Sequence, residues 1–229
     1  MPMSTIMAEF EPAVAAASDH SVIGDGSSIA LVSRKAEIDF LCWPDFSHPT
    51  LFARLEASDR GVFTLAPDLP DATITQSYMV DTNVLITQWQ GALGRARIVD
   101  ILLPDAGPGG LPTRLIRQAT AMEGHIPFRL LCRPRPNDGT EIPATETVRN
   151  TIGFRSASLP DLMLGRHDAL RAGDGEAHAE FTLKPSASAA FILSTRAAVE
   201  YHTTRRLERL IDLALAKQGK PSETIITSS

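Results

Sequence analysis

The sequence of 229 residues has little cysteine, few aromatic residues and no long apolar run. Its two cysteines, Cys42 and Cys132, lie in apolar strand-like segments, which favours buried reduced thiols over a disulfide or a metal site. No run of about eighteen apolar residues occurs, which argues against a membrane span. Residues 13–17 are rich in alanine but follow acidic Glu9 and Glu11, unlike the basic start of a signal peptide. We therefore expect a cytoplasmic protein without a membrane partner.

An excess of basic residues is also missing. The sequence has 22 lysines and arginines against 27 aspartates and glutamates, for a net charge of -5. Sequence-independent binding to nucleic-acid phosphates requires a basic protein surface, so we expect no nucleic-acid partner. The 43% of hydrophobic and 21% of charged residues are ordinary for a globular protein, with room for one large all-β domain or two small ones.

Motifs for common enzymatic chemistry are missing as well. The sequence contains no Gly-x-Ser-x-Gly turn, no phosphate-binding loop and no dinucleotide fingerprint. Its six histidines show no spacing typical of metal ligands. The glycine-containing segment 24–28 precedes a predicted strand instead of opening a helix, which disfavours phosphate binding. We expect no metal and no cofactor.

What the chain does contain is a series of short, apolar or β-branched segments separated by turn residues. The two clearest, residues 28–33 and 37–42, join through a tight turn and predict a hairpin. Further strands are predicted over residues 61–67, 73–79, 83–90, 95–103, 113–122, 127–133, 146–154, 159–164, 177–183 and 189–194. This regular spacing favours an all-β fold, a large antiparallel β-sandwich (super-sandwich), over alternating β-α-β units.

Two helices are predicted besides the strands. Residues 50–57 place apolar side chains at helical spacing, which predicts a short helix after the first hairpin. Residues 203–217 carry one clean apolar stripe and are followed by Gly219 and Pro221, which end a helix. The stripe consists of Leu207, Leu210, Ile211, Ala214 and Leu215. We therefore divide the chain into a leader (1–17), a β-sandwich domain (18–200), a linker-like amphipathic helix (201–218) and a tail (219–229).

Two groups of residues form a specific pattern. The first comprises Gly24, Asp25, Ala30, Leu31, Val32, Ser33, Ile38, Asp39, Phe40, Leu41, Cys42, Pro44, Phe46, Pro49 and Phe52. The second comprises Tyr78, Asp81, Thr82, Asn83, Val84, Leu85, Thr87, Asp100, Pro104 and Arg114. In order and spacing these residues resemble the trehalase-like N-terminal β-sandwich domain of bacterial and archaeal glucoamylases and trehalases, glycoside hydrolase family 15. The resemblance covers about residues 20–135 well, and residues 136–200 in strand pattern alone.

The resemblance implies a scaffold without catalytic residues of its own. Glycoside hydrolysis needs two carboxyl groups flanking the scissile bond. In the resembled enzymes both glutamates reside in an (α/α)6 barrel that follows the linker helix, where this sequence stops, so we expect no catalytic residue here. Asp25, Asp39, Asp45 and Asp100 are the carboxylates that could be imagined as a replacement pair. We favour hydrogen-bonding roles for them, in turns or at strand ends, with Asp100 at the end of a strand.

The loop over residues 43–49 is the best candidate for contact with a sugar or a partner. Trp43 and Phe46 could stack on sugar faces, while Asp45 and His48 could bind hydroxyl groups. The resemblance implies that the loop faces the barrel. The family has Arg at Asp45 and Asp at Ser47, so an ancestral ion pair across the interface could not survive unchanged; Gly26 and Ser27 likewise replace a Cys-Arg pair. In the alternative interpretation the loop folds on its own sandwich and buries Trp43 and Phe46.

Three functions stay open. We favour a freestanding, non-catalytic module, structural or accessory in carbohydrate metabolism and not an enzyme on its own. The second is a carbohydrate-binding module for α-glucosides. The third is the N-terminal part or a subunit of an inverting α-glucosidase, of glucoamylase or trehalase type, completed by a separate barrel. Partners would accordingly be an (α/α)6-barrel glycosidase chain, a second copy bound through the terminal helix, or an α-glucoside sugar.

Overall fold

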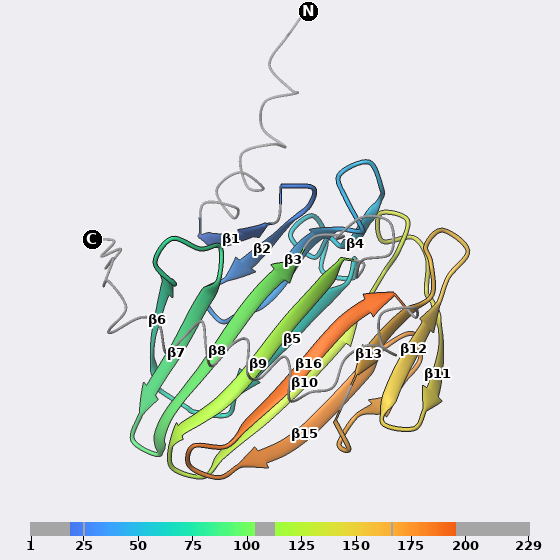
Figure 1. Cartoon of the computed structure of the whole chain (residues 1–229). Helices are drawn as coiled ribbons and strands as arrows, with labels where there is room; N and C mark the ends of the chain where they lie inside the picture. Colours follow the sequence, from blue (N-terminus) through green and yellow to red (C-terminus); the bar gives the residue numbers. More distant parts are fainter. Residues whose placement is uncertain (1–18, 25, 104–112, 166, 196–229) are drawn as a thin grey trace, which may run out of the picture.

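The computed structural model describes residues 19–24, 26–103, 113–165 and 167–195, and these form two 8-stranded antiparallel sheets (Figure 1). The first sheet has the order β1-β2-β3-β5-β10-β15-β14, with β4 paired to β3. Its strands are β1 (His20–Gly24), β2 (Ile29–Ser33), β3 (Glu37–Cys42), β4 (Thr50–Phe52), β5 (Val62–Pro67), β10 (Ile126–Arg133), β14 (Arg171–Ala172) and β15 (Ala177–Leu183).

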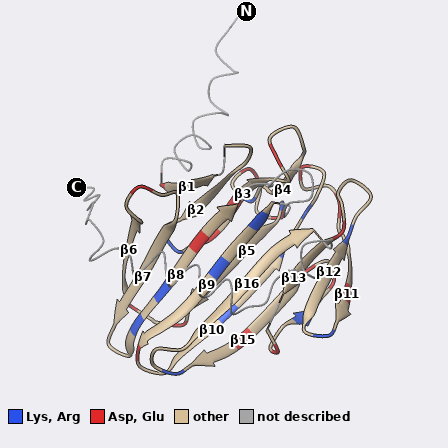
Figure 2. Ribbon diagram, in the orientation of Figure 1, with Lys and Arg blue, Asp and Glu red and all other residues tan. Residues whose placement is uncertain are grey.

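The second sheet has the order β11-β12-β13-β16-β9-β8-β7-β6. Its strands are β6 (Thr73–Tyr78), β7 (Leu85–Gly91), β8 (Gly94–Leu103), β9 (Arg114–Glu123), β11 (Ala144–Val148), β12 (Thr151–Arg155), β13 (Leu162–Gly165) and β16 (Ser188–Thr195). Acidic and basic residues occur on strands and in loops of both sheets (Figure 2). None of the described ranges contains a helix that could cross a membrane.

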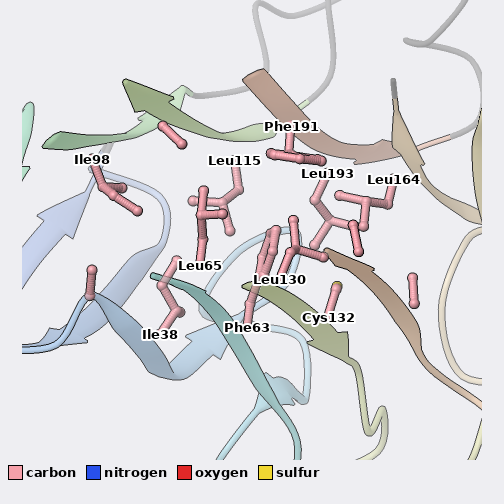
Figure 3. Packing of buried hydrophobic residues seen from close by; sticks show 14 of the residues in the cluster. Ile38, Phe63, Leu65, Ile98, Leu115, Leu130, Cys132, Leu164, Phe191 and Leu193 are labelled. Atoms are coloured by element: carbon pink, nitrogen blue, oxygen red, sulfur yellow. The ribbon is translucent and has the colours of Figure 1, made fainter. Parts of the chain in front are cut away.

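The hydrophobic core lies between the two sheets. Alternate residues of each strand face it, as the period of two in a β-strand requires: on β8 these are Ala96, Ile98 and Leu102. Figure 3 shows buried side chains from both sheets meeting there, among them Ile38, Phe63, Leu65, Leu130 and Cys132 from the first and Ile98, Leu115, Leu164, Phe191 and Leu193 from the second. The predicted all-β antiparallel class is confirmed, and the two layers with a shared core agree with the predicted β-sandwich.

The short helix predicted at residues 50–57 was wrong. Residues Thr50–Phe52 form β4, which pairs with β3 through Leu41 and Phe52. Turns follow, in which the amide of Ala53 donates to the carbonyl of Arg60 at 2.8 Å. Leu51 and Phe52 are adjacent in the chain and both fully buried. An extended strand can bury neighbouring residues on its two faces, whereas the predicted helix would have buried a single stripe.

Other differences concern the strands and the ends of the chain. The single strand predicted over residues 146–154 is a hairpin of β11 and β12, which turns at Arg149 with a φ of 57°. Strands β1 and β14 were not predicted. The leader (1–17), the C-terminal helix (201–218) and the tail (219–229) lie outside the described residues.

One ion pair is completely buried between the sheets. Asp100 on β8 and Arg117 on β9 are cross-strand partners, and both side chains are 0% exposed. The Nε of Arg117 donates to Asp100 Oδ1 at 2.7 Å, and its Nη2 donates to Oδ2 at 3.2 Å. The Asp100 carboxylate therefore accepts a bidentate, charge-assisted pair of hydrogen bonds from Arg117.

Arg117 also reaches the opposite sheet. Its Nη1 donates to the carbonyl of Phe63 on β5 at 2.5 Å, and its Nη2 donates to the carbonyl of Ala36 in the β2–β3 turn. The guanidinium carbon lies 4.9 Å from the centroid of the Phe63 ring, a cation–π distance. A single side chain thus ties the second sheet to a strand and a turn of the first.

We expect the substitution Arg117→Met to lower the free energy of unfolding by about 3–5 kcal/mol, because it leaves the Asp100 carboxylate buried without a counter-charge. Urea unfolding followed by circular dichroism measures the loss. The double variant Asp100→Leu/Arg117→Met should lose less than Arg117→Met alone, because no uncompensated charge remains.

The matched control is Arg129→Met. Arg129 pairs with Asp68 at 3.1 Å, but its side chain is 70% exposed, so the change should cost about 0–1 kcal/mol. A loss below about 1 kcal/mol in Arg117→Met would contradict the role of the buried pair.

Candidate functional site

The loop between β3 and β4, residues 43–49, is anchored by its tryptophan. Trp43 is fully buried and belongs to the core cluster between the sheets. Its amide donates to the carbonyl of Pro49 at 3.5 Å, and the Trp43–Pro44 peptide bond is cis. The indole Nε1 has no hydrogen-bond partner among the described residues. The ring holds the base of the loop by apolar packing and is not presented to a ligand.

Neighbouring segments fix the rest of the loop. The amide of Phe46 donates to the carbonyl of Ser27 at 2.9 Å, which joins the loop to the β1–β2 connection. The hydroxyl of Thr113, just before β9 in the other sheet, lies 3.5 Å from the carbonyl of Pro44. Ser28 donates its hydroxyl to the carbonyl of Cys42 at 2.6 Å, immediately before the loop. The loop therefore has a defined conformation set by both sheets.

Three polar side chains cluster at the tip of the loop. The amide and hydroxyl of Ser47 donate to Asp45 Oδ1 at 2.8 and 2.6 Å, and His48 Nδ1 lies 2.8 Å from the same oxygen. These bonds, the one from the Ser47 hydroxyl foremost, lower the pKa of Asp45 from 3.8 to about 2. The carboxylate is ionised at neutral pH. Within the described residues, none of the hydrogen bonds that it accepts ends on Oδ2.

Phe46 lies beside this cluster and is 54% exposed. The burial expected in the alternative interpretation therefore holds for Trp43 but not for Phe46, which reaches solvent together with Asp45 and His48. Contact of the loop with a sugar or a partner stays a prediction. An exposed ring next to a carboxylate and an imidazole can contact the apolar face of a sugar and its hydroxyls, or a complementary protein surface.

The carboxylates considered as a catalytic pair have separate basic partners. Asp39 lies 3.0 Å from His20 Nε2 and is 3.9 Å from Arg54. Asp100 lies within β8, fully buried against Arg117, so its predicted place at a strand end was wrong. Asp25 lies outside the described residues. Among the described carboxylates of this set, we find no two that face each other across a cleft.

A shallow pocket of about 750 Å³ lies elsewhere, between the β11–β12 turn and β14. Of the residues that line it, Asp168 is the one carboxylate. A single carboxylate does not supply the two groups that glycoside hydrolysis requires. The described residues also contain no group of three or more His, Cys, Asp or Glu side chains that could hold a metal ion.

The residues of the second motif group join the edges of the two sheets. The phenol of Tyr78 accepts a hydrogen bond from the amide of Val22 on β1 at 2.8 Å and donates to the carbonyl of the same residue at 2.9 Å. Asn83 Nδ2 donates to the carbonyl of Gly24 at 3.1 Å. Asp81 adopts a φ of 57° in the intervening turn and is exposed. These motif residues are structural, and they connect β1 to the β6–β7 turn.

Both cysteines are free. Burial, followed by the charges of Asp138 and Asp45, raises the pKa of the Cys42 thiol. Complete burial raises the pKa of the Cys132 thiol further. Both thiols are thus protonated at neutral pH. The predicted burial is found for Cys132, whereas Cys42 is half-buried.

Sequence reasoning missed two contacts near the site. The His20–Asp39 pair joins β1 to β3, and the pair of Asp100 and Arg117 holds the turn that leads into β3. Neither pair leaves a signal in local periodicity. An arginine amid apolar strand residues, at a position that faces the core by alternation, was the one available sign of the second.

The described residues form two antiparallel sheets that share a core, and Tyr78 and Asn83 join the edges of these sheets. The class is therefore an all-β sandwich domain, in which the loop 43–49 exposes the aromatic side chain of Phe46. The model of the family "Trehalase-like, N-terminal" matches residues 12–198. The chain belongs to this family.

A curated relative is Trehalase 1 of Sulfolobus acidocaldarius, which is 36% identical over 80 residues. The aligned segment covers 35% of this chain and 14% of that protein. The chain thus matches a small part of the relative's length.

We expect the carboxyl carbon of Asp45 to titrate by NMR with a midpoint of about 2. Because the folded-state pKa lies below the ordinary 3.8, Asp45 stabilises the folded loop above about pH 4, and this contribution is lost as the pH falls toward 2.

The variant Ser47→Ala removes the hydroxyl whose hydrogen bond lowers the pKa of Asp45 most. The titration midpoint of Asp45 should therefore move toward 3.8, and by more than in His48→Ala. A midpoint already near 3.8 in the unaltered protein would show that these hydrogen bonds do not form in solution.

Proposed function

We propose that this chain is a non-catalytic β-sandwich module related to glucoamylases and trehalases of glycoside hydrolase family 15, with an accessory role in carbohydrate metabolism. Its membership of the trehalase-like N-terminal family supports this setting. A match to 14% of a trehalase supports the view that the chain corresponds to one part of such an enzyme and not to its whole. The predicted cytoplasmic location stays a prediction.

The state of the carboxylates supports the absence of catalysis. A general acid must hold a proton at working pH, so its pKa has to be raised. The pKa of Asp45 is lowered instead, to about 2, and the carboxylates of Asp39 and Asp100 face His20 and Arg117. None of these three groups is set up to protonate a glycosidic oxygen.

The observation that carries the proposed role is the divided loop 43–49. Trp43 fixes its base in the core, and Phe46 projects into solvent beside an ionised Asp45. An exposed aromatic side chain on a conformationally fixed loop costs little entropy to dock, which is what a contact residue needs. We propose that this loop contacts an (α/α)6-barrel glycosidase, such as the catalytic part of an inverting α-glucosidase. The reversed charge at Asp45 would select a partner surface that is basic there.

A second candidate function uses the same loop. Phe46 with Asp45 and His48 offers an apolar ring next to hydrogen-bonding groups, the chemistry with which proteins bind α-glucosides. Titration of the labelled protein with maltose, trehalose or a longer glucan at millimolar concentration tests it. Amide chemical shifts are the proper readout because Trp43 and Trp89 are both buried, so tryptophan fluorescence would report mainly on folding.

We expect Phe46→Ala to weaken binding to a purified (α/α)6-barrel glycosidase at least about tenfold, the effect of removing an aromatic anchor worth roughly 1.4 kcal/mol or more. Calorimetry with the purified chain and barrel measures the change. The control is Leu93→Ala, which removes a 63% exposed apolar side chain at the turn between β7 and β8, at the far end of the sheet from β4 (Figure 1), and should leave binding unchanged.

Equal weakening by both variants would contradict the loop as the contact. Shifts caused by sugar but no affinity for a barrel would favour the second candidate function. Release of glucose from maltose or trehalose by the pure chain would overturn the non-catalytic proposal as a whole.

A further inference from the structure

The pocket between the β11–β12 turn and β14 lies where the outermost strands of the two sheets meet. Strand β11 ends the order of the second sheet, and β14 ends that of the first. The hydroxyl of Thr145 on β11 donates to the carbonyl of Gly173, just after β14, at 2.6 Å and joins the two edges. The pocket beside this contact has a volume of about 750 Å³. Pockets that hold small molecules measure roughly 300–1,000 Å³, so there is room for a ligand larger than a single inorganic ion.

The charges that line this pocket are mostly positive. Arg149 and Arg171 contribute two guanidinium groups, against the one carboxylate of Asp168. Arginine keeps its proton at any physiological pH, so this excess of positive charge is permanent. The chain as a whole has a net charge of -5, and a locally positive concave surface on such a protein concentrates small anions.

The guanidinium group of Arg149 is not engaged elsewhere in the described part of the chain. It forms no hydrogen bond and no ion pair there. Arg155, on the same hairpin, is by contrast paired with Glu146 at 2.7 Å. The charge of Arg149 is therefore left for a ligand, whereas the charge of Arg155 is neutralised within the protein.

The guanidinium group of Arg171 is held in place and keeps free donors. Its Nη1 donates to the carbonyls of Asp168 and Leu170 at 2.7 and 2.9 Å. Among the described residues, Nε and Nη2 donate no hydrogen bond. A donor group that is already fixed loses little entropy when an anion binds to it.

The other lining groups suit hydroxyl groups more than a flat sugar face. Asp168 supplies carboxylate oxygens, Asn150 an amide, and Leu170, which is 4% exposed, an apolar floor. None of the described lining residues is aromatic, so the stacking contact on which recognition of an uncharged sugar often depends is missing. The pocket thus combines donors for an anionic group with partners for hydroxyls.

We propose that this pocket binds a small anion that also carries hydroxyl groups, a phosphorylated monosaccharide. The phosphate contacts Arg149 and Arg171, and sugar hydroxyls contact Asp168 and Asn150. The choice of a sugar as the hydroxylated part rests on the proposed function in carbohydrate metabolism, whereas the anion site rests on the two arginines alone.

The test is a titration of the isotope-labelled full chain, followed by the amide signals of Asn150 and Ala172. We expect glucose 6-phosphate to shift both signals and to bind at least about tenfold more tightly than glucose or inorganic phosphate. Equal affinity for glucose would overturn the anion site, and equal affinity for inorganic phosphate would overturn the contacts to hydroxyls. No shift at these two residues with any of the three would overturn the whole proposal.

The variant Arg149→Asn separates lost binding from lost folding. Arg149 has a φ of 57°, a conformation that asparagine adopts more readily than arginine, so the melting temperature should not fall. The affinity for glucose 6-phosphate should fall at least about tenfold. The matched control Arg34→Gln removes the same charge from the exposed β2–β3 turn and should leave the affinity unchanged.

Equal weakening in both variants would show attraction by net charge and overturn the site. A negative result at this pocket leaves the proposed contact of loop 43–49 with a barrel standing, because that contact is measured separately with Phe46→Ala. None of the described residues that line the pocket belongs to that loop.

Discussion

The buried side chain of Arg117 is the constraint on which the relation of the two sheets depends. A shift of one sheet against the other would break its hydrogen bonds to carbonyl groups of the first sheet and leave buried polar groups without partners. Arg117 holds Asp100 in its own sheet and two carbonyl groups in the other. One of these belongs to the turn that feeds β3, and β3 leads directly into the aromatic loop. The position of the loop is therefore coupled to a charge in the core.

The loop itself combines a rigid part and an accessible part. Trp43 adds buried apolar area at the base, and the bonds from Ser47 and His48 hold Asp45 at the tip. Between them, Phe46 meets solvent on a backbone anchored to Ser27. If the loop serves as the contact surface proposed above, it requires no ordering upon binding, in contrast to loops that fold on their partners.

The local pattern of the sequence predicted much of the fold, and long-range contacts account for the rest. The strand at 177–183 and the hairpin partner at 37–42 have their predicted bounds because side chains alternate or cluster cleanly there. The helix predicted over residues 50–57 was wrong because the apolar residues there fit helical spacing, although neighbouring ones face opposite sides of a short strand. In the site, exposure of Phe46 and burial of Trp43 could not be separated from sequence, since both are aromatic residues of one short loop. Arg117 and His20 find their partners across strands, which only the topology reveals.

Tyr78 has a consequence for the behaviour of the molecule in solution. Strand β1 ends the first sheet, and the phenol occupies both hydrogen-bonding groups of Val22 at that margin. An intruding strand from another molecule would have to displace the ring before it could pair. The tyrosine that joins the two layers therefore also blocks this edge strand against pairing with strands of other molecules, the first step of fibril formation in proteins rich in β-structure.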